Sequence, residues 1–442
     1  MVPRSISRKS FIKNSSILFA AGSGLLASGQ AGSVGSFPAP AAGKALTLKN
    51  VRLETGFEYE EGQVSGTKTE LFTIEISNGK IKSVLPNNPA AKGMDAKGLL
   101  LLPAFREMHI HLDKTYYGEK WKATNRKGGG VKGMIALEQQ IIPGLLQNST
   151  YKAEKLIELL QSKGSNFARS HVNIEPTSKL DSLKHLQKAL EHKKDSFEAE
   201  LVAFPQHGLY YTDSTGLMKD AAQMGVAFIG GLDPASIDGS IEKSMDFVVQ
   251  LALDYHKGID IHLHEGGASG VQTIEYLIKK VNENPVLKGK TFISHCFVLA
   301  HLEQNRLEEV AEKMGNAQIG VISTIPFGRT IMPIPTLYKY GVDVRAGNDC
   351  IIDHWSTFGS GSVLQKANLA AQLYGYNTEL GLSRILKLAT HNVLPLDDKG
   401  NQQWPKTGDK ADLVLVEASC SAEAVSRISP VRSLIHRGNV VF

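Results

Sequence analysis

The stretch His109-Ile110-His111-Leu112-Asp113-Lys114 is the part of this 442-residue chain around which the rest can be interpreted. It follows an apolar run at residues 99–102, which is typical of a buried strand. Two histidines separated by one residue point to the same side of a strand. Neutral imidazoles placed in this way can coordinate one divalent cation, although the pair alone is also compatible with a polar strand face. The remainder of the chain decides between the two interpretations.

The composition is that of a soluble globular enzyme, with 42% hydrophobic and 21% charged residues. The length suits one (β/α)8 barrel with an appended domain. The net charge of +5 is scattered over the chain and no basic run occurs, which argues against a nucleic-acid partner. Three cysteines, with no Cys-x-x-Cys motif, do not form a disulfide framework. The sequence leaves the oligomeric state open, and a homo-oligomer is among the states allowed.

Residues 1–42 have the pattern of an export signal followed by a disordered leader. A basic start at Arg8-Lys9 precedes an apolar stretch at residues 17–26, which is too short for a stable membrane anchor. The start is similar to a twin-arginine motif in which Lys9 replaces the second arginine, and ordinary secretory export stays open. We therefore expect an exported, periplasmic protein, with a cytoplasmic location as the alternative.

Both ends of the remaining chain are strand-like. Residues 43–102 contain alternating apolar and polar stretches, and Asn78-Gly79 is a hairpin turn signal. Residues 391–442 have the same character. We expect these two segments to form one small β-sandwich domain.

The segment between them, residues 103–390, alternates between short apolar runs and helical patterns. Together with the segment before His109, eight apolar runs occur, the others being at residues 167–172, 200–204, 226–229, 259–263, 292–294, 319–322 and 342–346. Helical patterns occur at residues 151–163, 180–192, 241–256, 271–281, 302–314, 362–374 and 382–388. This alternation predicts an α/β protein with a closed parallel (β/α)8 barrel, that is, a TIM barrel.

Polar groups that can bind metal gather at the predicted carboxyl ends of the strands, where the active site of such a barrel lies. A purely structural scaffold would have no reason to concentrate them there. We expect His171, His207 and His264 to be packed or supporting side chains, and Asp233 to be structural. Besides these, the polar strand-end residues are His109, His111, Gln206, His262, Glu265, His295 and Asp349.

With these motifs in order, the chain resembles the cytosine deaminase-like branch of the amidohydrolase superfamily. The resemblance extends from about residue 44 to the end. The matching pieces are Pro103 to Thr115, Arg169-Ser-His-Val, Ala203-Phe-Pro-Gln206, Gly230-Gly-Leu-Asp-Pro234, His262-Leu-His-Glu265, Ser294-His295, Gly347-Asn-Asp349 and Asp353-His-Trp355.

The resemblance implies one catalytic divalent metal ion, Zn²⁺ or Fe²⁺, with the ligands His109, His111, His262 and Asp349. The residue types agree, because three imidazoles and a carboxylate suit either ion and leave room for a water. Binuclear relatives carry a carboxylated lysine on the fourth strand. This chain has Gly230-Gly231 there, which favours a mononuclear site.

Catalytic roles are assigned on the same basis. Asp349 would take a proton from the attacking water, which the metal activates. Glu265, three residues after His262, would carry a proton to a ring nitrogen and then to the leaving ammonia. His295 would stabilise the tetrahedral oxygen.

The substrate wall departs from the family pattern. Gln206 is expected to hydrogen-bond the ring edge and Trp355 to stack on the ring. The family often has an acidic residue or an amide after the metal-binding aspartate, whereas this chain has Cys350, a weak donor and acceptor. Asp113 and Lys114 are expected to brace the loop after the first strand rather than to touch substrate.

We therefore expect a metal-dependent hydrolytic deaminase of a small, cytosine-like N-heterocycle. The alternative is an amidohydrolase that cleaves a cyclic amide or a substituted amine on a heterocycle. A non-catalytic exported binding protein on a degenerate barrel is a third hypothesis, and the intact ligand set argues against it.

Overall fold

The computed structural model describes residues 45–123 and 129–442, which belong to a compact unit spanning residues 37–442. The predicted leader, residues 1–42, lies outside the described residues. Within the described part of the chain, no helix combines the length and the apolar character needed to cross a bilayer.

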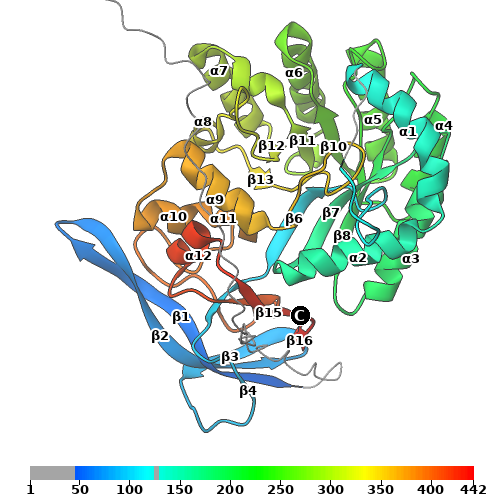
Figure 1. Ribbon diagram of the computed structural model, residues 1–442. Helices are drawn as coiled ribbons and strands as arrows, with labels where there is room; N and C mark the ends of the chain where they lie inside the picture. Colours follow the sequence, from blue (N-terminus) through cyan, green and yellow to red (C-terminus); the bar gives the residue numbers. More distant parts are fainter. Residues whose placement is uncertain (1–44, 124–128) are drawn as a thin grey trace, which may run out of the picture. The chain divides into compact units, whose positions relative to one another are not determined.

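Eight parallel strands form the barrel, and the (β/α)8 prediction is confirmed (Figure 1). Their hydrogen-bonded order is β13-β12-β11-β10-β9-β8-β7-β6. Each predicted apolar run overlaps one of these strands. The strands are β6 (Phe105–Ile110), β7 (Ser165–Asn173), β8 (Glu198–Phe204), β9 (Phe228–Ile229), β10 (Gly258–Leu263), β11 (Thr291–His295), β12 (Ile319–Ser323) and β13 (Val344–Ala346).

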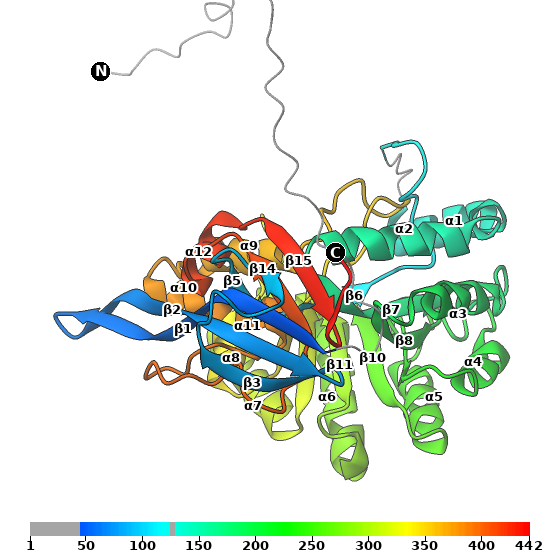
Figure 2. The same cartoon turned by 90° about the horizontal axis from the view of Figure 1, so that it is seen from below.

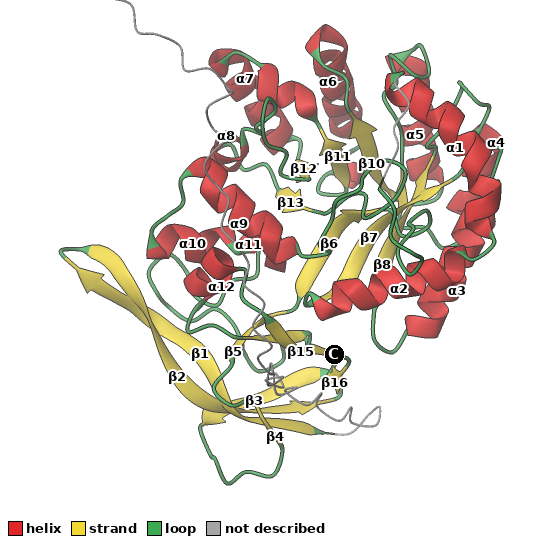
Figure 3. Ribbon diagram, in the orientation of Figure 1, coloured by secondary structure: helices red, strands yellow, loops and turns green. Residues whose placement is uncertain are grey.

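Helices surround these strands, as Figure 3 shows by colour. In chain order they are α1 (Gly130–Leu146), α2 (Ser149–Ser162), α3 (Asp181–Lys193), α4 (Thr215–Ala222), α5 (Ile241–Asp254), α6 (Gly267–Glu283), α7 (Gln304–Asn316), α8 (Ile334–Lys339), α9 (Val363–Tyr374), α10 (Glu379–Ile385) and α11 (Lys387–Thr390), with short 3-10 turns at Pro285–Leu287 and Phe297–His301. The sequence patterns did not indicate α1, α4 and α8. Helices α4 and α8 are short, and α1 contains Pro143 and three glycines, which weaken a helical pattern.

The barrel interior is built in layers, because side chains two residues apart on a strand point to the same face. On β7, Phe167 belongs to an inner apolar cluster at one end of the barrel. One step along the strand, Arg169 donates a 3.0 Å hydrogen bond to Asp260 of β10. One step further, the His171 ring lies 4.5 Å from the His262 ring. The barrel interior therefore has an apolar layer at one end, a layer with a buried ion pair in the middle, and a layer of imidazole side chains at the carboxyl ends of the strands.

The barrel closes where β6 meets the segment after β13. Ile110 and Asp349 form a parallel bridge, and the Asp349 amide donates a 2.7 Å hydrogen bond to the His109 carbonyl. The fully buried Glu107 fastens this seam. Its Oε1 accepts from the amides of His109 (3.0 Å) and Asn348 (2.9 Å), and its Oε2 accepts from the Asn348 side chain (2.6 Å). One carboxylate thus holds the first and last strands together.

The second domain is a β domain built from both ends of the described chain, as predicted, and its strands pair in one sheet where a sandwich was expected (Figure 2). Its strands are joined in one hydrogen-bonded sheet, in the order β16-β15-β14-β5-β1-β2-β3 with β4 beside β1. The predicted turn at Asn78-Gly79 joins β2 to β3. The strands are β1 (Leu46–Glu60), β2 (Gln63–Ser77), β3 (Lys80–Pro86), β4 (Met94–Asp95), β5 (Leu100–Pro103), β14 (Leu413–Val416), β15 (Val431–His436) and β16 (Asn439–Val440), with α12 (Ser421–Arg427) between β14 and β15.

A side chain at Gly347 should break the barrel seam. A Cβ there would lie 2.5 Å from the His109 amide nitrogen and 2.6 Å from Glu107 Oε1, closer than real contacts allow. We expect Gly347→Ala to lower the free energy of unfolding by about 1–3 kcal/mol, the usual cost of overpacking. Gly144→Ala in α1 is the control, because nothing lies within 4 Å of its added Cβ. Denaturant unfolding checks both, and equal stability of Gly347→Ala and wild type would contradict the account of the seam.

Candidate functional site

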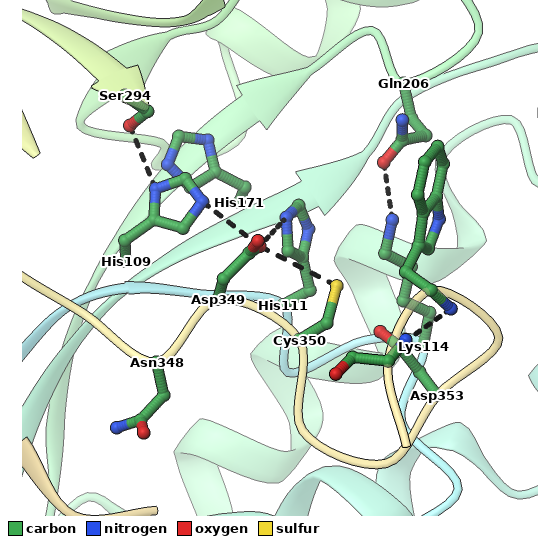
Figure 4. A network of polar contacts seen from close by, with 12 residues as sticks. His109, His111, Lys114, His171, Gln206, Ser294, Asn348, Asp349, Cys350 and Asp353 are labelled. Carbon is green, nitrogen blue, oxygen red and sulfur yellow. Dashed lines mark hydrogen bonds and ion pairs between the residues drawn. The ribbon is translucent and has the colours of Figure 1, made fainter. Parts of the chain in front are cut away.

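Four side chains converge at the carboxyl end of the barrel. One ligand atom each from His109, His111, His262 and Asp349 lies within 4.8 Å of the others. Asp349 Oδ1 lies 3.4 Å from His109 Nε2 and 3.3 Å from His111 Nε2 (Figure 4). Two ligands about 2.1 Å from a tetrahedral metal lie about 3.4 Å apart, so these spacings match a shared cation. Among the described residues this is the one such cluster.

Unpaired nitrogens in this cluster test whether a metal fits. His109 Nε2 and both ring nitrogens of His262 are buried and have no hydrogen-bond partner. Buried polar atoms are normally paired, and each neutral imidazole carries one lone pair on a ring nitrogen. Unsatisfied lone pairs of His109 and His262 beside the Asp349 carboxylate therefore favour a cation between these groups. The donor set of three imidazoles and a carboxylate fits one divalent ion of the first transition row.

The protonation states also suit ligation. Burial, with Lys114 nearby, lowers the pKa of His111 to about 3, and burial among other imidazoles holds the pKa of His262 well below its ordinary value. Burial would raise the pKa of Asp349, but the His109 and His111 rings, whose Nε2 atoms face its Oδ1, hold that pKa well below its ordinary value. The imidazoles of His111 and His262 are therefore neutral and the Asp349 carboxyl is ionised, as metal binding requires.

A buried relay fixes which nitrogen His109 offers. Ser294 Oγ donates a 2.7 Å hydrogen bond to Asp260 Oδ1, and Asp260 Oδ2 pairs with Arg169. Because the serine proton points to this carboxylate, Ser294 Oγ must accept from His109 Nδ1, 2.9 Å away. Nε2 of His109 then carries the free lone pair, directed at Asp349. Such partners orient metal-binding histidines in other proteins.

A cavity of about 210 Å³ lies over the cluster. It is smaller than the roughly 300–1,000 Å³ pockets that take drug-sized ligands, and it suits a single small ring. His264 lines it, although we expected that residue to be packed away from substrate. The lining residues are His111, Lys114, Gln206, Leu232, His262, His264, His295, Asp349, Cys350, Trp355 and Ser356.

Of the predicted catalytic residues His295 and Glu265, only His295 lines the cavity. His295 lines the cavity, and its ring stacks on His264 with 4.6 Å between centroids. Glu265 does not belong to the lining. Its Oε1 accepts hydrogen bonds from the Ser236 amide (2.7 Å) and hydroxyl (3.0 Å), while Oε2 is buried and has no hydrogen-bond partner. One carboxylate oxygen of Glu265 is thus anchored, and the other is buried without a hydrogen-bond partner.

Gln206, Cys350 and Trp355, which we expected to contact substrate, line the cavity, and Lys114 lines it with them. We expected Lys114 only to brace a loop. Its ammonium does lie 3.4 Å from Glu138, yet it also forms part of the cavity wall and donates a 2.5 Å hydrogen bond to Gln206 Oε1 (Figure 4). Burial opposes the charge on Lys114, but the neighbouring Glu138 raises its pKa, so the amine is protonated.

Three residues at or beside the site have positive backbone φ angles. His295 (φ 68°), Asp349 (φ 65°) and Asp233 (φ 36°) all adopt left-handed or nearby conformations that non-glycine residues seldom take. Such strain, of order 1–3 kcal/mol per residue, gathers at functional sites where the surrounding structure enforces it. Asp233 compensates by accepting hydrogen bonds from the amide and the ring of His264.

Several supporting residues were not identified from the sequence. They are Glu107 at the seam, Asp260 and Ser294 behind His109, and Glu138 behind Lys114. A signal existed for Asp260, since it lies two residues before His262 and so faces the same side of β10. Glu138 lies in a helix that the sequence pattern did not indicate.

Comparisons with known proteins identify the family of this chain. The amidohydrolase family matches residues 171–442. An uncharacterised protein of Escherichia coli K12, YahJ, is 51% identical over 400 residues, which cover 89% of this chain and 87% of that protein.

Two solved structures share the fold over nearly the whole described chain. N-isopropylammelide isopropylaminohydrolase from Burkholderia multivorans is 27% identical with a TM-score of 0.78, covering 90% of this chain and 98% of that one. The 5-methylcytosine deaminase of Klebsiella pneumoniae, liganded with 5-fluorocytosine, is 25% identical with a TM-score of 0.75, covering 90% and 97%. The barrel, the ligand cluster and the sequence match agree, and the chain belongs to the amidohydrolase family.

Proposed function

We propose that this chain is a hydrolytic deaminase that uses one Zn²⁺ or Fe²⁺ ion to release ammonia from an amino group on a small N-heterocycle. Hydrolysis of carbon–nitrogen bonds is the activity of its family. The observation that carries the proposal is the four-ligand cluster beneath a cavity of about 210 Å³ with Trp355 in its wall. A flat ring of six atoms fits such a space against an indole.

The residues divide the reaction between them. When bound, the metal lowers the pKa of a water to about 7, which provides a nucleophile at neutral pH. The two protons of the attacking water account for both transfers. Glu265 Oε2 would carry the first proton to a ring nitrogen as the water oxygen bonds to the ring carbon. Asp349 would accept the second proton from that oxygen, and Glu265 would pass it on to the departing amine, so that the carbon–nitrogen bond breaks and ammonia leaves. His295 donates to the oxygen that carries developing charge.

A second function is favoured by one comparison. The relative from Burkholderia multivorans is named for hydrolysis of N-isopropylammelide, an alkylamine on a ring, and it has a TM-score of 0.78. The same ligands and proton carriers would release a substituted amine instead of ammonia. The difference between the two functions lies in the leaving group.

A substrate panel separates these functions. We expect the metal-loaded protein to release ammonia from at least one aminopyrimidine, aminopterin or aminotriazine, measured by a coupled ammonia assay. Release of an alkylamine from N-alkylated rings, with no ammonia from any amino ring, would support the second function. Ring opening without release of any amine would overturn the deaminase proposal.

Removal of the carboxylate ligand should weaken metal binding as well as turnover. Changes to residues behind metal ligands cost about 10–100-fold in affinity, and loss of a ligand itself should exceed that. We therefore expect Asp349→Ala to lose more than about 100-fold in metal affinity, measured by competition with a chelator. Asp195→Ala, at an exposed aspartate, is the control. A full equivalent of tightly held metal in Asp349→Ala would contradict its role as a ligand.

Glu265 should matter for proton transfer and not for metal binding. Glu265→Gln keeps the hydrogen-bond acceptor for Ser236 but cannot carry the proton. We expect a loss of about 10²–10⁴-fold in kcat with metal content unchanged. Glu312→Gln, at an exposed position of α7, is the matched control. Retention of wild-type kcat by Glu265→Gln would assign the proton transfer to another group.

A further inference from the structure

The orientation of Gln206 is decided by Lys114. The Lys114 side chain is 3% exposed, and its Nζ lies 2.5 Å from Gln206 Oε1. An ammonium group only donates hydrogen bonds, so the amide must present its oxygen to Lys114. The Gln206 nitrogen then lies on the other side, and no hydrogen bond among the described residues uses it. Since Gln206 lines the cavity, its two N–H groups are left to meet a ligand.

Lys114 itself is held in place from behind. Glu138 Oε1 lies 3.4 Å from its Nζ, accepts a 2.8 Å hydrogen bond from Asn173, and lies 3.3 Å from His354 Nε2. The ring of Trp355 lies 5.6 Å from Nζ, within the range of a cation–π contact. The ammonium donates to Glu138 and Gln206, which leaves one of its three protons without a partner among these two residues, and Lys114 lines the cavity. The charge is therefore fixed rather than mobile.

Strong hydrogen-bond acceptors are scarce in the wall of the cavity. Of the described residues lining the cavity, Asp349 is the one carboxylate, and its Oδ1 is turned toward His109 and His111. Cys350, beside Asp349, offers only a thiol, which accepts hydrogen bonds weakly. A ring that enters therefore meets two strong donors, one of them charged, and Asp349 is the one anionic acceptor among the described lining residues.

We propose that Lys114 is the specificity-determining residue of the site and that it selects amino heterocycles carrying an oxo group. The ring oxygen, or a deprotonated lactam edge, would accept from the Lys114 ammonium and the Gln206 amide together. A diamino edge would place donors against donors, and a buried donor without a partner is costly. This proposal rests on the proposed function and names its substrate class.

Four triazines of one ring size test this selection. Ammelide, ammeline and melamine carry two, one and no oxo groups beside their amino groups, and cyanuric acid carries oxo groups only. We expect wild-type kcat/KM for ammonia release to fall in the order ammelide, ammeline, melamine. We expect cyanuric acid to bind, as measured by calorimetry, and Lys114→Met to weaken that binding by about tenfold or more. The preference of Lys114→Met for ammelide over melamine should nearly vanish.

A second variant tests the same proposal in case Lys114→Met does not fold. Gln206→Glu keeps an acceptor for Lys114 but replaces the free N–H groups with an acceptor. We expect this variant to lose affinity for cyanuric acid and to shift its preference toward melamine. Lys132→Met, at an exposed lysine of α1, is the control. Metal content and the unfolding midpoint are measured for all variants.

The outcomes separate the two proposals. If Lys114→Met and Gln206→Glu are folded and metal-loaded and still bind cyanuric acid as tightly as wild type, Lys114 does not determine selectivity. Failure of the wild type to bind cyanuric acid, or a preference of the wild type for melamine, would overturn the selectivity role too. Lys114-dependent binding of cyanuric acid without ammonia release from any of the rings would support the selectivity role and reject the proposed deamination.

Discussion

The pairing of His109 with Asp349 at the barrel seam is the interaction on which the rest of this structure depends. The Asp349 amide donates to the His109 carbonyl over 2.7 Å, and the side chains of the same two residues meet over 3.4 Å. The same two residues therefore help to close the barrel and contribute to the ligand cluster. Glu107 binds the backbone of both edges and gives the seam its rigidity. A metal site placed on strands in this way is positioned more accurately than one placed on loops.

The buried charges beneath the site connect stability to chemistry. Burying Arg169 is costly unless it is paired, and it finds Asp260, Glu200 and the ring of Phe228, which lies 3.8 Å from its Cζ. The same Asp260 receives the proton of Ser294, and that bond sets the tautomer of His109. The ion pair in the core thus determines which imidazole nitrogen faces the ligand cluster.

Much of this arrangement could be predicted from the sequence because it follows from local pattern. The apolar runs lie on the barrel strands, and the His109–His111 spacing predicts two imidazoles on one face. Pairings between distant residues could not be predicted. Glu107 and Asn348 are 241 residues apart, and neither has a periodic signal. Lys114 was assigned to the loop alone, because no sequence pattern shows that Gln206, 92 residues away, meets its ammonium. His264 was expected to be packed, because its place in the cavity depends on the loop geometry around Asp233.

X-ray absorption spectroscopy on the purified, metal-loaded protein tests the central claim most directly. The account predicts one divalent ion per chain, surrounded by three imidazole nitrogens and oxygen ligands at about 2.0–2.2 Å. The absence of a tightly bound ion, a second metal at short distance, or a sulfur ligand from Cys350 would contradict it.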